Sequence, residues 1–169
     1  MPIPTKIQPV DDNTKKLAAE RHDILFFVLT HVAICHYEKI HKVYFEHQVV
    51  FIRGNDNLRL DALRQDDDLE SDIIIDVHYF RKSYMDAPVY GSWLEKKIEL
   101  YELLTGRKAR GVLLAIIGNE RMKEGNSLPL TAQGINSCSR DIVLEVYSCK
   151  DIGFHPGAIS TELFASNLK

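Results

Sequence analysis

The fold is decided by residues 58–80, which read LRLDALRQDDDLESDIIIDVHYF. Apolar and polar residues alternate in the first segment, 58–63, and every second residue of 71–80 is β-branched or aromatic. The acidic run between them, 65–70, is typical of a solvent-exposed turn because turns favour aspartate. The stretch therefore predicts a β-hairpin whose turn is centred on residues 67–68.

Antiparallel pairing about this turn places residues whose numbers sum to about 137 opposite each other. Asp61 then faces Asp76. In the same register Arg59 faces His78, and strand alternation directs all four side chains to one face, with Leu58, Leu60 and Ala62 on the other. Two opposed carboxylates repel each other unless a positive charge lies between them. Mg²⁺ is commonly held by one or two carboxylates, so we predict a metal site at Asp61 and Asp76.

The segment that precedes the hairpin predicts a helix and then a strand. Apolar residues recur at helical intervals from Lys15 to about His41, as one long helix or two consecutive ones. Within it, residues 24–29 are apolar nearly all round, which indicates burial on several sides. The run 49–52 is β-branched and aromatic and ends at a turn, so it predicts a strand.

The segment that follows the hairpin predicts a second helix. We expect a loop up to Gly91, because Ser92 and Glu95 form a capping box that is typical of a helix start. The helix is expected to run to about Leu104, with Gly106 as the residue that follows its last turn.

A buried strand is expected next, since residues 112–117 are continuously apolar. Strand, helix and buried strand in succession predict two parallel strands. Residues 120–139 predict a loop and residues 141–147 the last strand. The fold class is therefore α/β, with a mixed β-sheet flanked by helices in the order α-β-β-β-α-β-β.

Length and composition favour one soluble domain, 1–169, with a core of about 12–150 and a tail, 151–169, that is either mobile or binds a partner. Three cysteines without a C-x-x-C pair predict a reducing compartment, and we expect the cytoplasm. The longest apolar stretch, 24–35, is too short to cross a bilayer, so no membrane contact is expected. The net charge of -3 disfavours a dedicated, sequence-independent nucleic-acid binder but allows a local basic patch.

An acid on one strand, followed after a hairpin by an apolar strand ending in acid-x-base, resembles the PD-(D/E)xK nuclease superfamily. The matching residues are Asp61 and Asp76-Val77-His78, and the resemblance covers roughly residues 15–118. His78 stands where the family usually has lysine. The resemblance implies a restriction-endonuclease-like core, in which Asp61 and Asp76 bind Mg²⁺ or Mn²⁺ and orient the attacking water. His78 would activate that water or stabilise charge at the phosphate.

The resemblance also implies a substrate, a nucleic acid that approaches through Arg81, Lys82 and Lys96. A further acid often comes from the preceding helix in that family, and the candidates are Glu20, Glu38 and Glu46. The resulting hypothesis is a metal-dependent nuclease or phosphodiesterase.

A competing hypothesis is a catalytically degenerate interaction or regulatory module that keeps this fold and binds a protein partner or a second copy of itself. The missing lysine and the mildly acidic charge favour it, so whether the chain is an enzyme stays open. A basic rim around Asp61 and Asp76 would support the enzyme, and an apolar patch elsewhere would support the module.

One other group contains metal-ligating residue types. His31 and Cys35 lie one helical turn apart, with His36 beside them. A zinc site would need two more ligands, and no spacing in the sequence nominates them, so we interpret this group as part of the core.

Overall fold

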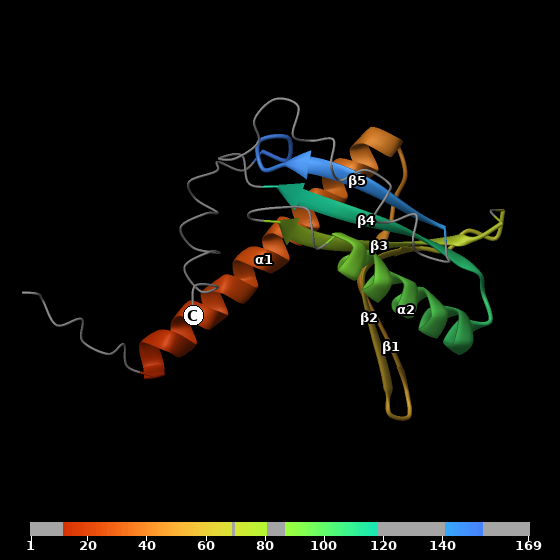
Figure 1. Ribbon diagram of the computed structural model, residues 1–169, viewed down its shortest axis with the longest axis horizontal. Helices are drawn as coiled ribbons and strands as arrows, with labels where there is room; N and C mark the ends of the chain where they lie inside the picture. The colour runs from red at the N-terminus through yellow and green to blue at the C-terminus, as the bar shows by residue number, and fades with distance from the viewer. Residues whose placement is uncertain (1–11, 69, 81–86, 118–140, 154–169) are drawn as a thin grey trace, which may run out of the picture.

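The computed structural model describes residues 12–68, 70–80, 87–117 and 141–153 (Figure 1). Over these ranges the order α-β-β-β-α-β-β is confirmed: α1 Asp12–His41, β1 Glu46–Arg53, β2 Asp56–Arg64, β3 Asp72–Phe80, α2 Ala87–Thr105, β4 Ala109–Ile117 and β5 Ile142–Ser148. The predicted loop 120–139 and most of the predicted tail 151–169 lie outside the described residues.

The five strands form one mixed sheet in the order β1-β2-β3-β4-β5. β2 pairs antiparallel with both β1 and β3, whereas β3, β4 and β5 run parallel to one another. The predicted parallel pair on either side of α2 is therefore confirmed.

The two helices cover opposite faces of this sheet (Figure 1). Alternate residues of β3 face each helix, because strand side chains point to the two faces in turn. The core under α1 contains Leu29, Ala33, Ile34 and Tyr37 of the helix with Ile73, Ile75 and Val77 of β3. The core under α2 contains Leu94, Ile98 and Tyr101 with Ile74 and Leu113.

The N-terminal half of α1 is more exposed than its sequence suggested. Ile24, Phe27 and Val28 are exposed by 63%, 55% and 40%, whereas Leu29 is buried. Burial on several sides is therefore wrong for 24–29. The reason is that α1 presents one face to the sheet and its first turns run past the sheet (Figure 1). Neither helix in the described ranges is long and apolar enough to cross a membrane.

Helix α2 begins at Ala87 rather than at Ser92, so the predicted capping box and the predicted loop over 87–91 are wrong, while residues 81–86 lie outside the described residues. Pro88 falls in the first turn, where a missing N–H costs nothing, and the helix continues through Gly91. Its end is as predicted. The helix stops at Thr105, and Gly106 follows with a positive φ of 70°, a conformation that glycine adopts without steric cost.

Strand β2 leaves β3 part of the way along. The pairing between them covers only Ala62–Arg64 and Ile73–Ile75, while β2 remains paired with β1 along its length. Arg59 pairs with Val50 of β1, so the prediction that Arg59 faces His78 is wrong.

The alternation of side chains in β2 breaks at the same point. Leu60 and Leu63 both lie in the core under α2, whereas Ala62 lies in the core under α1, so the predicted strict alternation is wrong. Across from Asp61, Gln48 of β1 has a positive φ of 54° and interrupts the regular pairs. The pairs on either side keep one register, so the distortion is confined to Gln48 and Asp61.

Candidate active site

Asp61 and Asp76 meet where β2 separates from β3. The pair Ala62–Ile75 confirms the predicted register, in which residue numbers sum to 137. One position further on the ladder has ended, and Asp61 Oδ2 accepts the Val77 N–H at 2.7 Å. The Asp61 carboxyl group also lies close enough to Asp76 for the charge of one acid to oppose the ionisation of the other. The predicted register therefore holds up to Ala62 and Ile75, and the two acids lie near each other just beyond the last pair, where the strands separate.

Asp76 is almost fully buried, at 2% exposure, and has two basic partners. Lys97 Nζ of α2 donates to Oδ1 at 2.7 Å, and His78 Nε2 lies 2.8 Å from Oδ2. Both oxygens of this carboxylate are therefore engaged. The three side chains and Asp61 form one compact group of two acids and two bases.

The pKa values of the two acids of this group are shifted in opposite directions. Burial and the negative charge of Asp76 together raise the pKa of Asp61 to about 6. Burial also opposes ionisation of Asp76, but the hydrogen bond from His78 and the charge of Lys97 outweigh it and lower the pKa of Asp76 to about 2. Such a division between neighbouring carboxyl groups is common where groups are tuned for chemistry.

Lys97 is the residue that sequence reasoning missed. A signal was present, because Lys97 lies between Leu94, Ile98 and Tyr101 on the helical stripe that faces the sheet. A lysine on such a stripe needs an anionic partner, and Asp76 of β3 supplies it.

The close packing of α2 on the sheet determines how near Lys97 lies to the strands. Gly111 of β4 lies beneath the helix, and a Cβ there would be 2.9 Å from Leu94 Cδ2 and 3.0 Å from Ile98 Cδ1. Only a residue without a side chain allows this spacing. A glycine in a strand thereby lets the lysine reach a carboxylate beside it.

Aromatic side chains of α2 hold His78 in place. The His78 ring stacks on Tyr90 with centroids 4.2 Å apart, and Trp93 contacts both rings edge-on. His78 is consequently fixed on one side by rings and on the other by Asp76.

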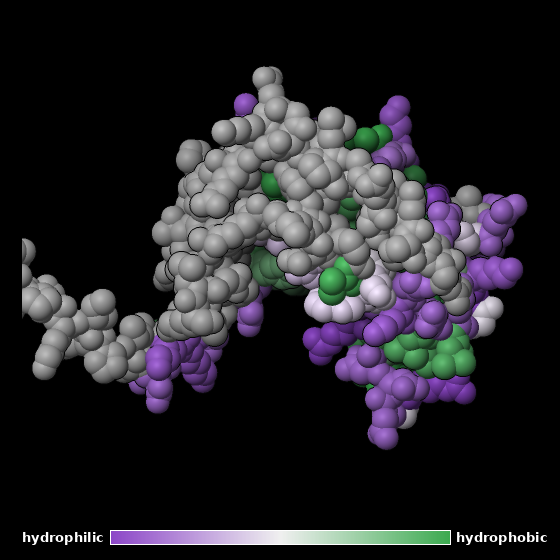
Figure 2. All heavy atoms as spheres, viewed as in Figure 1, coloured by the Kyte–Doolittle hydropathy of each residue, from purple (hydrophilic) through white to green (hydrophobic). Residues whose placement is uncertain are grey.

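A basic pocket of about 410 Å³ opens beside this group. Its lining includes Arg59, Lys96 and Lys97, together with Asn57, Leu58 and Leu100. Lys96 was predicted to bind substrate and does line the pocket, whereas Arg81 and Lys82 lie outside the described residues. The described surface over α2 is mainly hydrophilic, with an island of hydrophobic atoms (Figure 2).

The acid of α1 that accompanies Asp61 is Asp23. The two residues line a second pocket, of about 380 Å³, with Phe26, Phe27, Thr30 and Gln48. Neither Glu20, Glu38 nor Glu46 lines it, and Glu38 instead binds His47. The acid of α1 in this pocket is therefore Asp23 and none of the three glutamates named as candidates.

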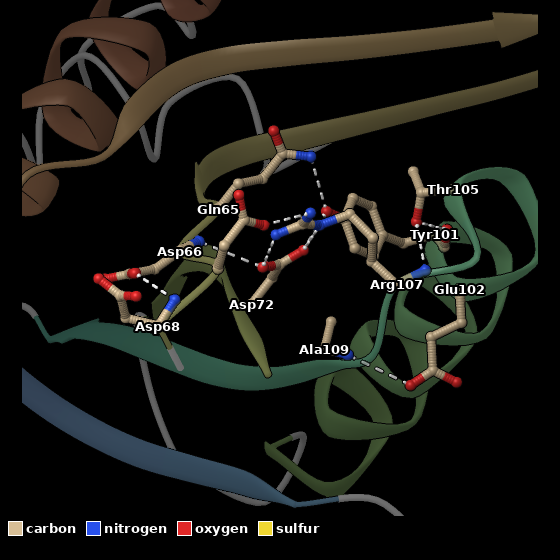
Figure 3. Close-up of polar contacts among 10 residues, drawn as sticks. Gln65, Asp66, Asp68, Asp72, Tyr101, Glu102, Thr105, Arg107 and Ala109 are labelled. Atoms are coloured by element: carbon tan, nitrogen blue, oxygen red, sulfur yellow. Dashed lines mark hydrogen bonds and ion pairs between the residues drawn. The ribbon is translucent and has the colours of Figure 1, made fainter. Parts of the chain in front are cut away.

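A second charged cluster lies at the start of β3 and is structural (Figure 3). The buried Asp72 carboxylate receives two hydrogen bonds from Arg107, at 2.6 and 2.9 Å, and one from the Tyr101 hydroxyl at 2.6 Å. Burial opposes its ionisation, but these bonds hold the pKa of Asp72 below its ordinary value. The cluster ties β3 to α2 and to the start of β4, and all its charges are paired.

Comparisons with known proteins identify no relative: no family model matches the chain, and no curated protein or solved structure matches it either.

Proposed function

We propose that the chain is a metal-dependent phosphodiesterase that acts on nucleic acid. One arrangement carries the proposal: Asp61 lies near enough to Asp76 for the two charges to repel, Lys97 binds the second acid, and Lys97 also lines a basic pocket. Acids that gather around a cation, next to bases that attract phosphate, are the parts that phosphodiester hydrolysis requires.

The acid pair fits a hard divalent cation. Two neighbouring carboxyl groups in a buried setting repel each other once both are ionised, as the raised pKa of Asp61 indicates. Mg²⁺ or Mn²⁺ would remove that repulsion and prefers carboxylate oxygens. Lys97 would release an oxygen of Asp76 to admit the ion, a movement open to it because its side chain is one-third exposed.

Each side chain then has a distinct task. The bound ion would supply Lewis-acid chemistry at a phosphate oxygen. Lys97, released from Asp76, would stabilise the negative charge that develops on the phosphate. His78 would exchange a proton with the attacking water or the leaving oxygen. Arg59 and Lys96 would bind neighbouring phosphates of the backbone.

Calorimetric titration with Mn²⁺ and Mg²⁺ at pH 8 tests the site. Wild type should bind saturably and Asp61→Asn should lose that binding. Asp56→Asn, an exposed change on the same strand, should keep it and serves as the control. Cleavage of labelled single-stranded DNA, double-stranded DNA and RNA with each metal then tests the activity, which should depend on Asp61 and Lys97. Saturable metal binding with no cleavage of any of the three would refute the nuclease.

The alternative is a catalytically degenerate interaction module. It is favoured by one feature: both oxygens of Asp76 are already bonded, to Lys97 and His78, so the group is closed without an ion. Absence of Mn²⁺ binding in wild type would favour this alternative. The search would then turn to protein partners or self-association.

A further inference from the structure

A second group of ligating side chains lies on the face of α1, away from Lys97. His31 and Cys35 stand one turn apart on α1, and β1 brings His47 against them. His31 Nδ1 is 2.8 Å from His47 Nδ1, and Cys35 Sγ is 3.7 Å from His31 Nε2. One ligand atom from each residue lies within 4.8 Å of the others. The third ligand, which no sequence spacing nominated, comes from a strand.

Glu38 fixes the orientation of His47. Its Oε1 lies 2.9 Å from His47 Nε2, and its Oε2 accepts the Phe45 N–H at 2.9 Å. Glu38 is 12% exposed and His47 19% exposed, so this pair is well shielded. A carboxylate that binds one histidine nitrogen and turns the other nitrogen toward a common point is the usual support of a metal-ligating histidine.

The donors and acceptors along the chain of contacts from Glu38 through His47 and His31 to Cys35 can be assigned consistently. If Nε2 of His47 donates to Glu38, its Nδ1 carries a lone pair and accepts from His31 Nδ1. His31 Nε2 then carries a lone pair and faces the Cys35 thiol. His31 therefore uses a different nitrogen for each neighbour. Because this side chain is exposed, its ring can rotate so that one nitrogen faces the centre of the group.

We propose that His31, Cys35 and His47 bind a zinc-class divalent cation, supported by Glu38. Two imidazoles and a thiolate are soft donors, which suit Zn²⁺ and exclude Mg²⁺. Nitrogen and sulfur ligands of a tetrahedral Zn²⁺ lie about 3.6 Å apart, given bond lengths of about 2.1 and 2.3 Å, close to the observed separation of Cys35 and His31. On binding, the Cys35 thiol loses its proton to solvent and the imidazoles stay neutral.

Three protein ligands leave the fourth position for water or an added ligand. Beside Cys35 and Glu38 the surface forms a pocket of about 480 Å³, lined further by Lys39, Lys42, Val43 and Tyr44. Its two lysines favour an anion as the added ligand. The site is independent of the proposed phosphodiesterase group, whose metal would be held by oxygen donors.

Titration of the metal-free full chain with Co²⁺, followed by displacement with Zn²⁺, tests the proposal. In wild type, one equivalent of bound Co²⁺ should give a thiolate-to-cobalt charge-transfer band. Cys35→Ser should abolish the band, and His47→Gln should weaken Zn²⁺ binding. Glu38→Gln should keep the band and bind about 10- to 100-fold more weakly. His36→Gln, a change to the neighbouring histidine that meets the Tyr147 ring edge to face, is the matched control and should bind as wild type does.

Absence of the charge-transfer band in wild type overturns the proposal outright and needs no variant to fold. An unchanged Zn²⁺ affinity in both Cys35→Ser and His47→Gln overturns it as well. Asp61→Asn should leave the cobalt spectrum unchanged, which separates this site from the acid pair. A negative result for the proposed function at Asp61 would therefore not refute the zinc site. A negative result for the zinc site would likewise not refute the proposed function.

Discussion

Replacement of Asp61 by asparagine should stabilise the protein at alkaline pH and not at acidic pH. Asparagine imitates the protonated acid, since its carbonyl can still accept the Val77 N–H and its amide can donate to Asp76. It cannot ionise, so it avoids the repulsion that burial and Asp76 impose on the wild-type residue.

The magnitude follows from the pKa of Asp61, which rises from 3.8 in the unfolded chain to about 6 in the folded protein. At about 1.4 kcal/mol per pH unit, ionisation of Asp61 costs about 3 kcal/mol of stability above pH 7. Because the pKa of Asp61 is higher in the folded protein, the stability that its protonated form contributes is fully present below pH 3.8. That contribution is lost as the pH rises through about 6. The lowered pKa of Asp76 acts only between pH 3.8 and about 2, below this window.

Urea unfolding in EDTA between pH 4.5 and 8, followed by the fluorescence of Trp93, the only tryptophan, measures the effect. The stability of Asp61→Asn relative to wild type should grow across this range and level off near 3 kcal/mol. The difference in stability between Asp56→Asn and wild type should not change with pH. A difference that does not change with pH, or a variant less stable than wild type at pH 8, would refute the reasoning. Repeating the measurement with excess Mn²⁺ in place of EDTA should reduce the difference in stability between Asp61→Asn and wild type, because the metal stabilises wild type alone.

Three further changes test other parts of the structure. Tyr101→Phe removes the hydroxyl bond to the buried carboxylate of Asp72 and should lower the free energy of unfolding by about 2 kcal/mol in urea titrations at pH 7. Gly106→Ala forces a side chain into positive φ with no new contact, so it should cost about 1 kcal/mol by the same assay, and no loss would contradict the backbone argument. Lys97→Met should raise the pKa of Asp76 from about 2 toward its ordinary value, measured by NMR titration of the carboxyl carbon, and move acid unfolding to higher pH. An unmoved pKa would show that His78 alone holds Asp76 ionised.

Local chemistry made the hairpin predictable. The aspartate-rich turn indicated the register, and a buried face makes a register error costly, so the predicted sum of 137 is confirmed over Ala62–Arg64 and Ile73–Ile75. Gly106 likewise marked the end of α2, since its backbone conformation excludes most other residues.

The rest depended on contacts between distant segments. Lys97 and Asp76 are 21 residues apart, and only the packing of α2 onto β3 brings them together. His47 joins His31 and Cys35 because the chain reverses after α1, which no residue spacing encodes. The start of α2 was missed because Ser92 and Glu95 satisfy the capping pattern inside a helix already formed.

Gly111 has a consequence for how this chain can diverge in evolution. The contacts from its position to Leu94 and Ile98 leave no volume for a methyl group, so a larger residue there demands smaller ones on the helix. In relatives of this chain, the side-chain volumes at positions 94, 98 and 111 should vary in a compensating way wherever a lysine is kept at position 97. Where that lysine is absent, the side-chain volumes at the three positions should vary independently of one another.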